Sequence, residues 1–169
     1  MTAPGMGAIV EATTWLIALV GAQGFEVEDK YLKVVATPEN GGTVKELRAL
    51  ATGRNLAGPE GLFLEGFGVG SFYAPNRRLN EVFEVLKQGS KSPSLRYSYD
   101  CEGPHIQGLR VTRLVEPLLN EASIRVSLQV ENQGAQDLWV APWVRCDLRP
   151  GGALDAGDRI DIPTLSGIR

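Results

Sequence analysis

The 169-residue chain is predicted to be an all-β protein whose antiparallel strands form a twisted β-sandwich. Three observations lead to this prediction: apolar and polar residues alternate in several runs, turn signals separate those runs, and the glycine content is high. Twenty glycines and ten prolines favour many turns and short strands over long helices. The turns place a strand roughly every 12 residues, the spacing of a sandwich or barrel rather than of alternating strands and helices.

The expected strands follow one another from residue 25, and each is a run in which alternate residues are apolar. YLKVVAT has Leu32, Val34 and Ala36 on one face, and EVFEVLK alternates more loosely. LRYSYDC and GLRVTRLV repeat the pattern. ASIRVSLQVEN alternates over its whole length, as a half-buried antiparallel strand requires. Its apolar face consists of Ala122, Ile124, Val126, Leu128 and Val130.

The sandwich domain is expected to span residues 25–169, after an apolar segment at residues 1–24. In that segment AIVEATTWLIALVGA is too short to span a membrane, and no Lys or Arg precedes it, which disfavours an export signal. We expect it to pack on the domain as a buried helix or strand, with a poorly formed export signal as the alternative. The compartment, cytoplasmic or periplasmic, stays open.

The C-terminal end of the sequence is unusual for a complete sandwich. RIDIPTL reads as a weak strand, and no polar tail follows it. We therefore expect either a truncated chain or one half of a larger sheet system, and in both cases the sandwich is partial. A bare strand edge at this point would favour pairing with another chain.

Composition and motifs argue against several kinds of partner. A net charge of −3 without a basic excess does not fit a nucleic-acid binder. Cys101 and Cys146 cannot form a metal site alone, and they are either a disulfide or two buried free thiols. GVGSF lacks the lysine of a phosphate-binding loop. His105, the only histidine, lies in a turn, where we expect a surface group rather than a ligand. We expect no cofactor and no metal.

Three stretches, in order, are similar to parts of one known superfamily. YLKVVATPENGGTVKELRALATGRNLAGPEG has two strands around a Gly-Gly turn, followed by a Gly-Arg-Asn-Leu turn. GVGSFYAPNRRLNE has an Asn-Arg pair after a glycine and an aromatic residue, and IRVSLQVENQGAQDLWVAPWVRCDL has a long strand, an Asn-containing turn and a second strand. Together they resemble the N-terminal half of the galactose mutarotase (aldose 1-epimerase) superfamily, which implies a mutarotase-like supersandwich.

The resemblance also implies which functions are kept and which are lost. In mutarotases the Asn-Arg pair touches sugar hydroxyls, and the matching positions here are Asn76 with Arg77 or Arg78. The family's general-acid histidine is matched by Trp143, and the region of its general-base glutamate lies beyond residue 169. Ring opening needs both an acid and a base, and an indole N–H does not ionise near neutral pH. We therefore expect catalysis to be absent, and no residue is assigned a catalytic role.

The segment from Trp139 to Arg145 has the residue types of a sugar-binding surface. Trp139 and Trp143 would share a face of a regular strand, and Pro142 between them indicates a bulge or an edge. Either both indoles fill the core, or one stacks on a sugar ring, in which case Trp143 is the expected platform. Arg145 shares that face and needs a partner. The expected partners are Glu65, Glu81, Glu84 or a ligand.

The segment YAPNRRLNE offers further polar groups. Because adjacent residues of a strand point to opposite faces, only one of Arg77 and Arg78 can line a given cleft. The alternative is a solvated turn with exposed arginines.

These residues and the resemblance predict a non-catalytic carbohydrate-binding module that holds a sugar in a concave face. The predicted contacts are Tyr73, Asn76, Arg77, Arg78, Trp143 and Arg145. One alternative is an aldose 1-epimerase-type sugar isomerase, or a related carbohydrate-active enzyme, that uses other residues. Another is a structural or interaction domain that forms a homo-oligomer or joins a missing C-terminal half.

Overall fold

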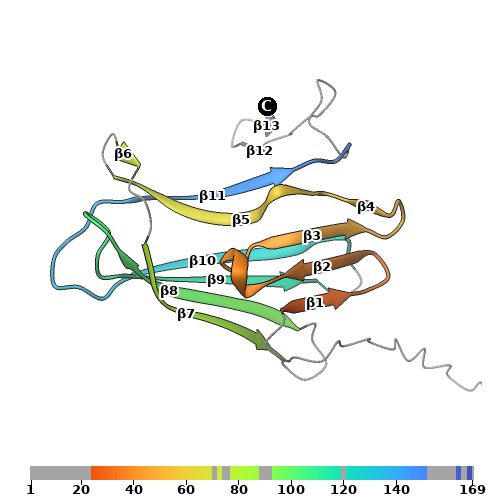
Figure 1. Ribbon diagram of the computed structural model, residues 1–169. Helices are drawn as coiled ribbons and strands as arrows, with labels where there is room; N and C mark the ends of the chain where they lie inside the picture. Colours follow the sequence, from red (N-terminus) through yellow and green to blue (C-terminus); the bar gives the residue numbers. More distant parts are fainter. Residues whose placement is uncertain are drawn as a thin grey trace, which may run out of the picture.

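In the computed structural model, the described residues form antiparallel sheets and no α-helix (Figure 1). The structure describes residues 24–69, 72–73, 77–87, 93–118, 121–151, 163–164 and 167–168. The all-β, antiparallel prediction is confirmed over these ranges. The apolar segment at residues 1–23 lies outside them, so the prediction that it packs on the domain is not addressed. No helix within the described ranges is long and apolar enough to cross a membrane.

The first sheet, here called sheet A, has the strand order β1-β2-β3-β5-β11. Its strands are β1 (Phe25–Glu28), β2 (Leu32–Ala36), β3 (Val44–Ala49), β5 (Ala57–Val69) and β11 (Ala141–Leu148). Two short strands extend it: β4 (Arg54–Asn55) pairs with β3, and β6 (Phe72–Tyr73) pairs with β5. β11 ends the order, so the proline at its second position, Pro142, lies on an edge strand, where a residue without an N–H donor is tolerated.

The second sheet, sheet B, has the order β10-β9-β8-β7, in which neighbours in the sheet are also neighbours in the chain. Its strands are β7 (Arg77–Leu86), β8 (Ser94–Glu102), β9 (Leu109–Pro117) and β10 (Ile124–Asn132). β9 alternates strictly between buried and half-buried residues, and β10 between half-buried and exposed ones over most of its length. The period-2 pattern of the sequence therefore corresponds to an inner and an outer face. A separate two-stranded pair, β12 (Pro163–Thr164) and β13 (Gly167–Ile168), follows β11.

Sheets A and B pack through two buried apolar clusters in a sandwich-like arrangement. The first cluster joins strands β1, β2, β3 and β5 of sheet A to β8 and β9 of sheet B, and the second joins β5 to β8 and β9. Fully buried members include Phe25, Val34, Val44, Leu62, Phe67, Leu95, Tyr97, Tyr99, Ile106, Val111 and Val115. Burial of these apolar side chains is the main force holding the two sheets together.

The Gly-Gly turn between β2 and β3 is pressed against sheet B. It follows a short 3₁₀ turn (η1, Pro38–Asn40), and Gly41 and Gly42 have φ of 61° and 63°, which favours glycine at both positions. A Cβ on Gly42 would lie 2.8 Å from the Cγ of Tyr97, and one on Gly41 would overlap the Arg78 guanidinium. The two glycines therefore allow the close approach of the sheets as well as the turn.

An ion pair between Glu65 of β5 and Arg113 of β9 crosses the sandwich. Both side chains are fully buried, and Arg113 Nη1 donates to Glu65 Oε2. Arg113 Nη1 also donates to the carbonyl oxygen of Phe63, and Nη2 donates to that of Gly41 at 2.8 Å. One guanidinium thus connects the carboxylate, the β5 backbone and the β2–β3 turn.

A bulge in β5 turns Glu65 toward the interior. Leu62 and Glu65 are both buried although they are three residues apart, which a regular strand does not allow. Between them Phe63 has φ 64°, and the pairing with β11 shifts by one residue, from Leu62↔Cys146 to Leu64↔Arg145. The extra residue on β5 reverses the alternation beyond it.

The first prediction concerns this pair. Glu65→Gln keeps the shape of the side chain but leaves the buried Arg113 charge without its carboxylate. We expect the free energy of unfolding, measured by urea denaturation, to fall by about 3–5 kcal/mol. The control is Arg96→Ala, which breaks an exposed pair with Glu84 and should cost less than about 1 kcal/mol. Equal losses in the two variants would show that the buried pair does not stabilise the sandwich.

Candidate functional site: the outer face of sheet B

Arg78, one of the predicted sugar contacts, points into the sandwich. Its Nη1 donates to Tyr97 Oη at 3.2 Å, its guanidinium lies 4.7 Å from the centroid of the Tyr99 ring, and its Nη2 lies 3.8 Å from Glu65 Oε1. Its side chain is only 17% exposed. Asn76 and the side chains of Tyr73 and Arg77 lie outside the described part of the chain, so their predicted contacts are not addressed.

Trp143 and Arg145 lie together on the outer face of sheet A. Their partners on β5 are Gly66 and Leu64, whereas the inward-pointing Glu65 between those two pairs with Val144. Trp143 is half-buried, and its indole lies over Gly66, where a Cβ would overlap the ring. The two residues share a face as predicted, but it is the opposite face of sheet A from the one that Arg78 approaches. The described residues therefore do not form a single cleft from Arg78, Trp143 and Arg145.

The predicted partners of Arg145 include two that are wrong. Glu65 pairs with Arg113 inside the sandwich, and Glu84 pairs with Arg96 on sheet B. Arg145 is exposed, and its charge contributes to lowering the pKa of Asp147, after the hydrogen bonds that this carboxylate accepts from Arg149 and from the Glu60 backbone.

Trp139 also differs from expectation. It precedes β11 rather than lying on it, and it is 91% exposed, so the alternative in which both tryptophans fill the core is wrong. An indole so exposed is unusual, because tryptophan is on average highly buried.

The two thiols are free, with Cys101 buried and Cys146 exposed, so the expectation that both are buried is wrong for Cys146. Burial raises the pKa of the Cys101 thiol to about 11. Within the described ranges, no three His, Cys, Asp or Glu side chains are placed to hold a metal ion. His105 lies in the exposed turn that the sequence predicts.

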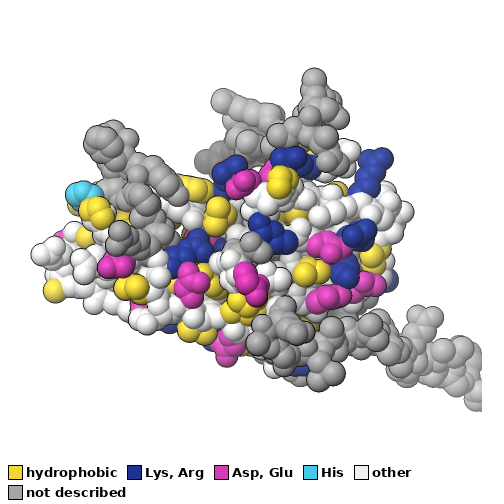
Figure 2. Space-filling model, viewed as in Figure 1, with side chains coloured by type: hydrophobic (Ala, Val, Ile, Leu, Met, Phe, Trp, Pro, Cys, Tyr) yellow, Lys and Arg dark blue, Asp and Glu magenta, His cyan; other side chains and the backbone are white. Residues whose placement is uncertain are grey.

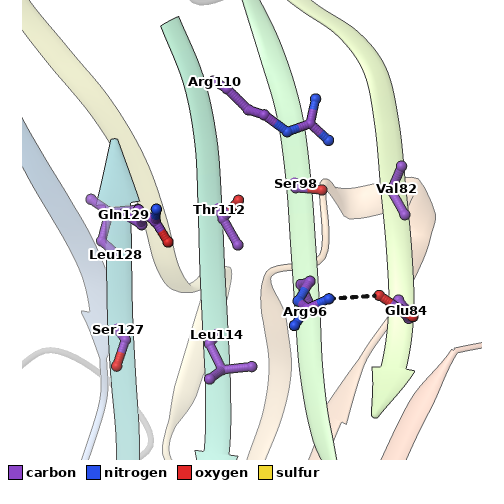
Figure 3. A pocket seen from close by; sticks show the side chains of 10 residues that line it. All are labelled: Val82, Glu84, Arg96, Ser98, Arg110, Thr112, Leu114, Ser127, Leu128 and Gln129. Atoms are coloured by element: carbon purple, nitrogen blue, oxygen red, sulfur yellow. Dashed lines mark hydrogen bonds and ion pairs between the residues drawn. The ribbon is translucent and has the colours of Figure 1, made fainter. Parts of the chain in front are cut away.

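A concave region on the outer face of sheet B is the candidate site (Figure 3). We call it the sheet hollow; its volume is about 500 Å³, and all four strands of sheet B contribute to it. It is lined by Val82, Glu84, Arg96, Ser98, Arg110, Thr112, Leu114, Ser127, Leu128 and Gln129. Most of these are the polar positions of the alternating runs, to which sequence analysis assigned no role in binding.

The strand register arranges the lining in rows across the sheet. The central row is uncharged: Gln129 pairs with Thr112, which pairs with Ser98. On one side of it lies the row with Arg110 and Asp100, and on the other the row with Arg96 and Glu84. Successive rows are two residues apart along each strand, about 7 Å. A ligand over the central row would therefore be within reach of guanidinium groups on both sides.

Acidic partners hold both guanidinium groups in place. Arg110 Nη1 lies 2.7 Å from Asp100 Oδ1, and Arg96 Nη1 lies 3.3 Å from Glu84 Oε2. Asn80 donates to Asp100 Oδ2 at 3.1 Å, and this hydrogen bond, with that from Arg110, lowers the pKa of the Asp100 carboxyl. Because a guanidinium has five N–H donors, each arginine keeps donors for a ligand.

The charges on the surface are mixed. On the side of the molecule shown in Figure 2, basic and acidic side chains are interspersed. In the sheet hollow the two arginines are each offset by a carboxylate. The hollow therefore suits a neutral ligand with many hydrogen-bonding groups better than a highly charged one.

The second prediction concerns the tyrosines beside Arg78. Burial raises the pKa of Tyr97 from 10.0 to about 12 and raises that of Tyr99 as well. Between pH 10 and about 12 the folded chain keeps a proton that the unfolded chain has lost, so the free energy of unfolding should fall as the pH rises. For Tyr97 the loss is at most about 3 kcal/mol. Urea denaturation at several alkaline pH values measures it, and Tyr97→Phe should reduce the slope; an unchanged slope would contradict the assignment.

Comparison of the chain with family models, curated proteins and solved structures finds no match. The resemblance to galactose mutarotases therefore stays a prediction from the three sequence motifs.

Proposed function

We propose that this protein is a carbohydrate-binding module that holds a sugar in the sheet hollow without converting it. The observation that carries the proposal is the uncharged row of Gln129, Thr112 and Ser98 between two oriented guanidinium groups. Sugar hydroxyls both donate and accept hydrogen bonds, and this lining offers hydroxyls, an amide and guanidinium donors. The mutarotase-like motifs support the same ligand class.

The dimensions of the hollow are consistent with this proposal. Its volume of about 500 Å³ is within the range of small-molecule sites, which is about 300–1,000 Å³. Val82 ends the central row beside Ser98, and Leu114 lies beside Arg96 in the next row; both add apolar surface against which the C–H face of a sugar can pack.

The lining supports binding rather than catalysis. Opening a sugar ring needs a general acid and a general base on opposed sides of the sugar. Among the described residues that line the hollow, Glu84 is the only carboxylate, and it is paired with Arg96. Trp143, at the position of the family's acid, lies on the outer face of the other sheet.

The third prediction tests the proposed site by calorimetric titration with hexoses, uronic acids and oligosaccharides. Gln129→Ala removes an amide of the central row, and we expect affinity for the bound sugar to fall about three- to tenfold. Arg96→Ala removes a charged donor and should cost tenfold or more, on the order of 1.5–3 kcal/mol.

Two matched controls accompany these variants. Arg125→Ala removes an exposed arginine from β10 that does not line the hollow, and Arg145→Ala removes the arginine that sequence analysis predicts as a sugar contact because it shares a face with Trp143. Neither should change affinity. Absence of binding to every sugar, or loss of binding in Arg145→Ala alone, would refute the proposal. Polarimetry on fresh α-glucose or α-galactose should show no rate above buffer, and a faster rate would support the isomerase alternative.

An interaction domain is the second candidate, favoured by the exposed side chains of β11. Val144 and Leu148 are 42% and 44% exposed on a strand that ends sheet A. Val144 is paired with Glu65 of the neighbouring strand β5, and Glu65 points inward. Val144 therefore lies on the inner face of sheet A, at a place that sheet B does not cover. An exposed apolar edge of this kind favours pairing with another strand.

The fourth prediction separates this candidate from a monomeric binding module. If β11 joins two copies, sedimentation velocity will show a dimer, and Val144→Lys will return it to a monomer because a charge on the edge opposes pairing. A monomer at all concentrations excludes the self-association that this candidate requires.

A further inference from the structure

Two loops meet at one end of the sandwich and line a second, open pocket. They are the turn between β8 and β9, residues 103–108, and the connection between β10 and β11, residues 133–140. The backbone N–H of Gln133 donates to the carbonyl oxygen of Gly108 at 2.8 Å, and Gly134 packs directly against Gly108. The cavity between them, here called the loop-end pocket, has a volume of about 700 Å³.

Several interactions hold these loops in one conformation. Ile106 is fully buried in the core and anchors the first loop. Asn132 fixes the second, because its Oδ1 accepts a hydrogen bond from Gly134 N at 3.0 Å and its Nδ2 donates to Gln136 O at 2.8 Å. A pocket whose walls are already fixed loses little conformational entropy when a ligand binds.

Polar side chains line the pocket without using their hydrogen-bonding groups inside the protein. They are His105, Gln107, Gln136 and Asp137, all exposed, and none of them makes a side-chain hydrogen bond or ion pair within the described part of the chain. His105 has φ 73°, a conformation that is unfavourable for a non-glycine residue and is often found at functional sites. An imidazole, two amides and one carboxylate thus remain available to a ligand.

Trp139 provides an apolar surface on the same connection. Exposure alternates over residues 137–140: Leu138 and Val140 pack on the core, whereas Asp137 and Trp139 are exposed. Trp139 directly follows Leu138, the last residue of this connection that lines the pocket, so the exposed indole adjoins the rim of the pocket without lining its interior. An indole left 91% exposed beside unpartnered polar groups is the arrangement that stacks on the apolar face of a polar ligand.

We propose that the loop-end pocket is a second saccharide site, in which one sugar unit stacks on Trp139 and hydrogen-bonds to Gln107, Gln136 and Asp137. The choice of ligand class rests on the proposed function, whereas the site itself depends on different residues. The sheet hollow has no aromatic side chain among its described lining residues, whereas at the loop-end pocket Trp139 follows the lining residue Leu138 and would supply a stacking surface at the rim.

Tryptophan fluorescence of the full chain, titrated with glucose, galactose, glucuronate, maltotriose and cellotriose, tests the proposal. Stacking removes the Trp139 indole from water, so at least one of these sugars should shift the emission maximum to shorter wavelength. Trp139→Ala should abolish the shift and weaken binding by about tenfold, comparable to the loss of an aromatic stacking platform for a nucleic-acid base. Because Trp139 is exposed, the variant should fold normally, which circular dichroism verifies.

Trp143→Phe is the matched control, because it removes the half-buried indole and should leave the shift in place. Gln107→Ala should weaken the interaction without removing the Trp139 signal. No shift with any of the five sugars, or a shift that persists in Trp139→Ala, would overturn the proposal.

Gln129→Ala distinguishes failure of this site from failure of the sheet hollow. If the Trp139 signal appears and calorimetric affinity is unchanged in Gln129→Ala, the pocket binds sugar and the hollow does not. If calorimetric binding is lost in Gln129→Ala and no sugar changes the fluorescence, the hollow binds sugar and the second site is refuted.

Discussion

The buried ion pair between Glu65 and Arg113 is the constraint on which the arrangement of the two sheets depends. Apolar contacts between sheets are non-directional, so several relative positions can bury similar area. A buried carboxylate, in contrast, is stable only where a cation meets it with good geometry, because desolvation of an unpaired charge costs several kcal/mol. The pair therefore selects one position of sheet B relative to sheet A.

Two local features of the backbone allow this ion pair to form. The bulge at Phe63 turns the carboxylate inward, and the left-handed Gly41 places a backbone carbonyl against the Arg113 guanidinium. The positive φ of Gly41 suits glycine, whereas that of Phe63 is unfavourable for a residue with a side chain. Together the two features give the arginine acceptors from β5 and from the β2–β3 turn, so hydrogen bonds across the sandwich offset the strain at Phe63.

The same pair explains why Arg78 does not line an open cleft. Glu65 has two cations near it, Arg113 and Arg78, so the buried cluster has an excess of positive charge. The rings of Tyr97 and Tyr99 lie 5.1 Å from the Arg113 guanidinium and 4.7 Å from that of Arg78, respectively, where cation–π attraction offsets part of this excess. Arg78 is therefore used inside the protein, although its motif resembles one that contacts sugar in mutarotases.

Features that a few neighbouring residues determine could be predicted from the sequence. The alternation in residues 122–130 gives the two faces of β10, the Gly41-Gly42 dipeptide gives the turn between β2 and β3, and Pro142 gives an edge strand. Each depends on backbone geometry that a few neighbouring residues determine.

Features that depend on the meeting of distant strands could not be predicted in this way. The sequence does not locate the bulge: Gly61, two residues before Phe63, is compatible with one, but the bulged residue is not glycine and the one-residue shift is visible only in the pairing with β11. Without the bulge Glu65 would point outward, to the face of sheet A that carries Arg145, so the bulge is why the predicted pairing of these two residues is wrong. The sheet hollow could likewise not be predicted from the sequence of any single strand, because the register of four strands brings its rows of side chains together.

The distribution of aromatic side chains separates structural roles from binding roles. Tyr97 and Tyr99 are buried beside the arginine cluster, and Trp143 is half-buried with its ring against Gly66. Trp139 alone among the described tryptophans and these tyrosines is almost fully exposed. Of these rings, Trp139 therefore offers the surface on which a ligand could stack, whereas sheet B offers hydrogen-bonding groups and a shallow apolar contact. The two proposed sites would differ in the part of a sugar that they recognise, because the sheet would present donors and acceptors to hydroxyls and the loop would present an indole to the C–H face.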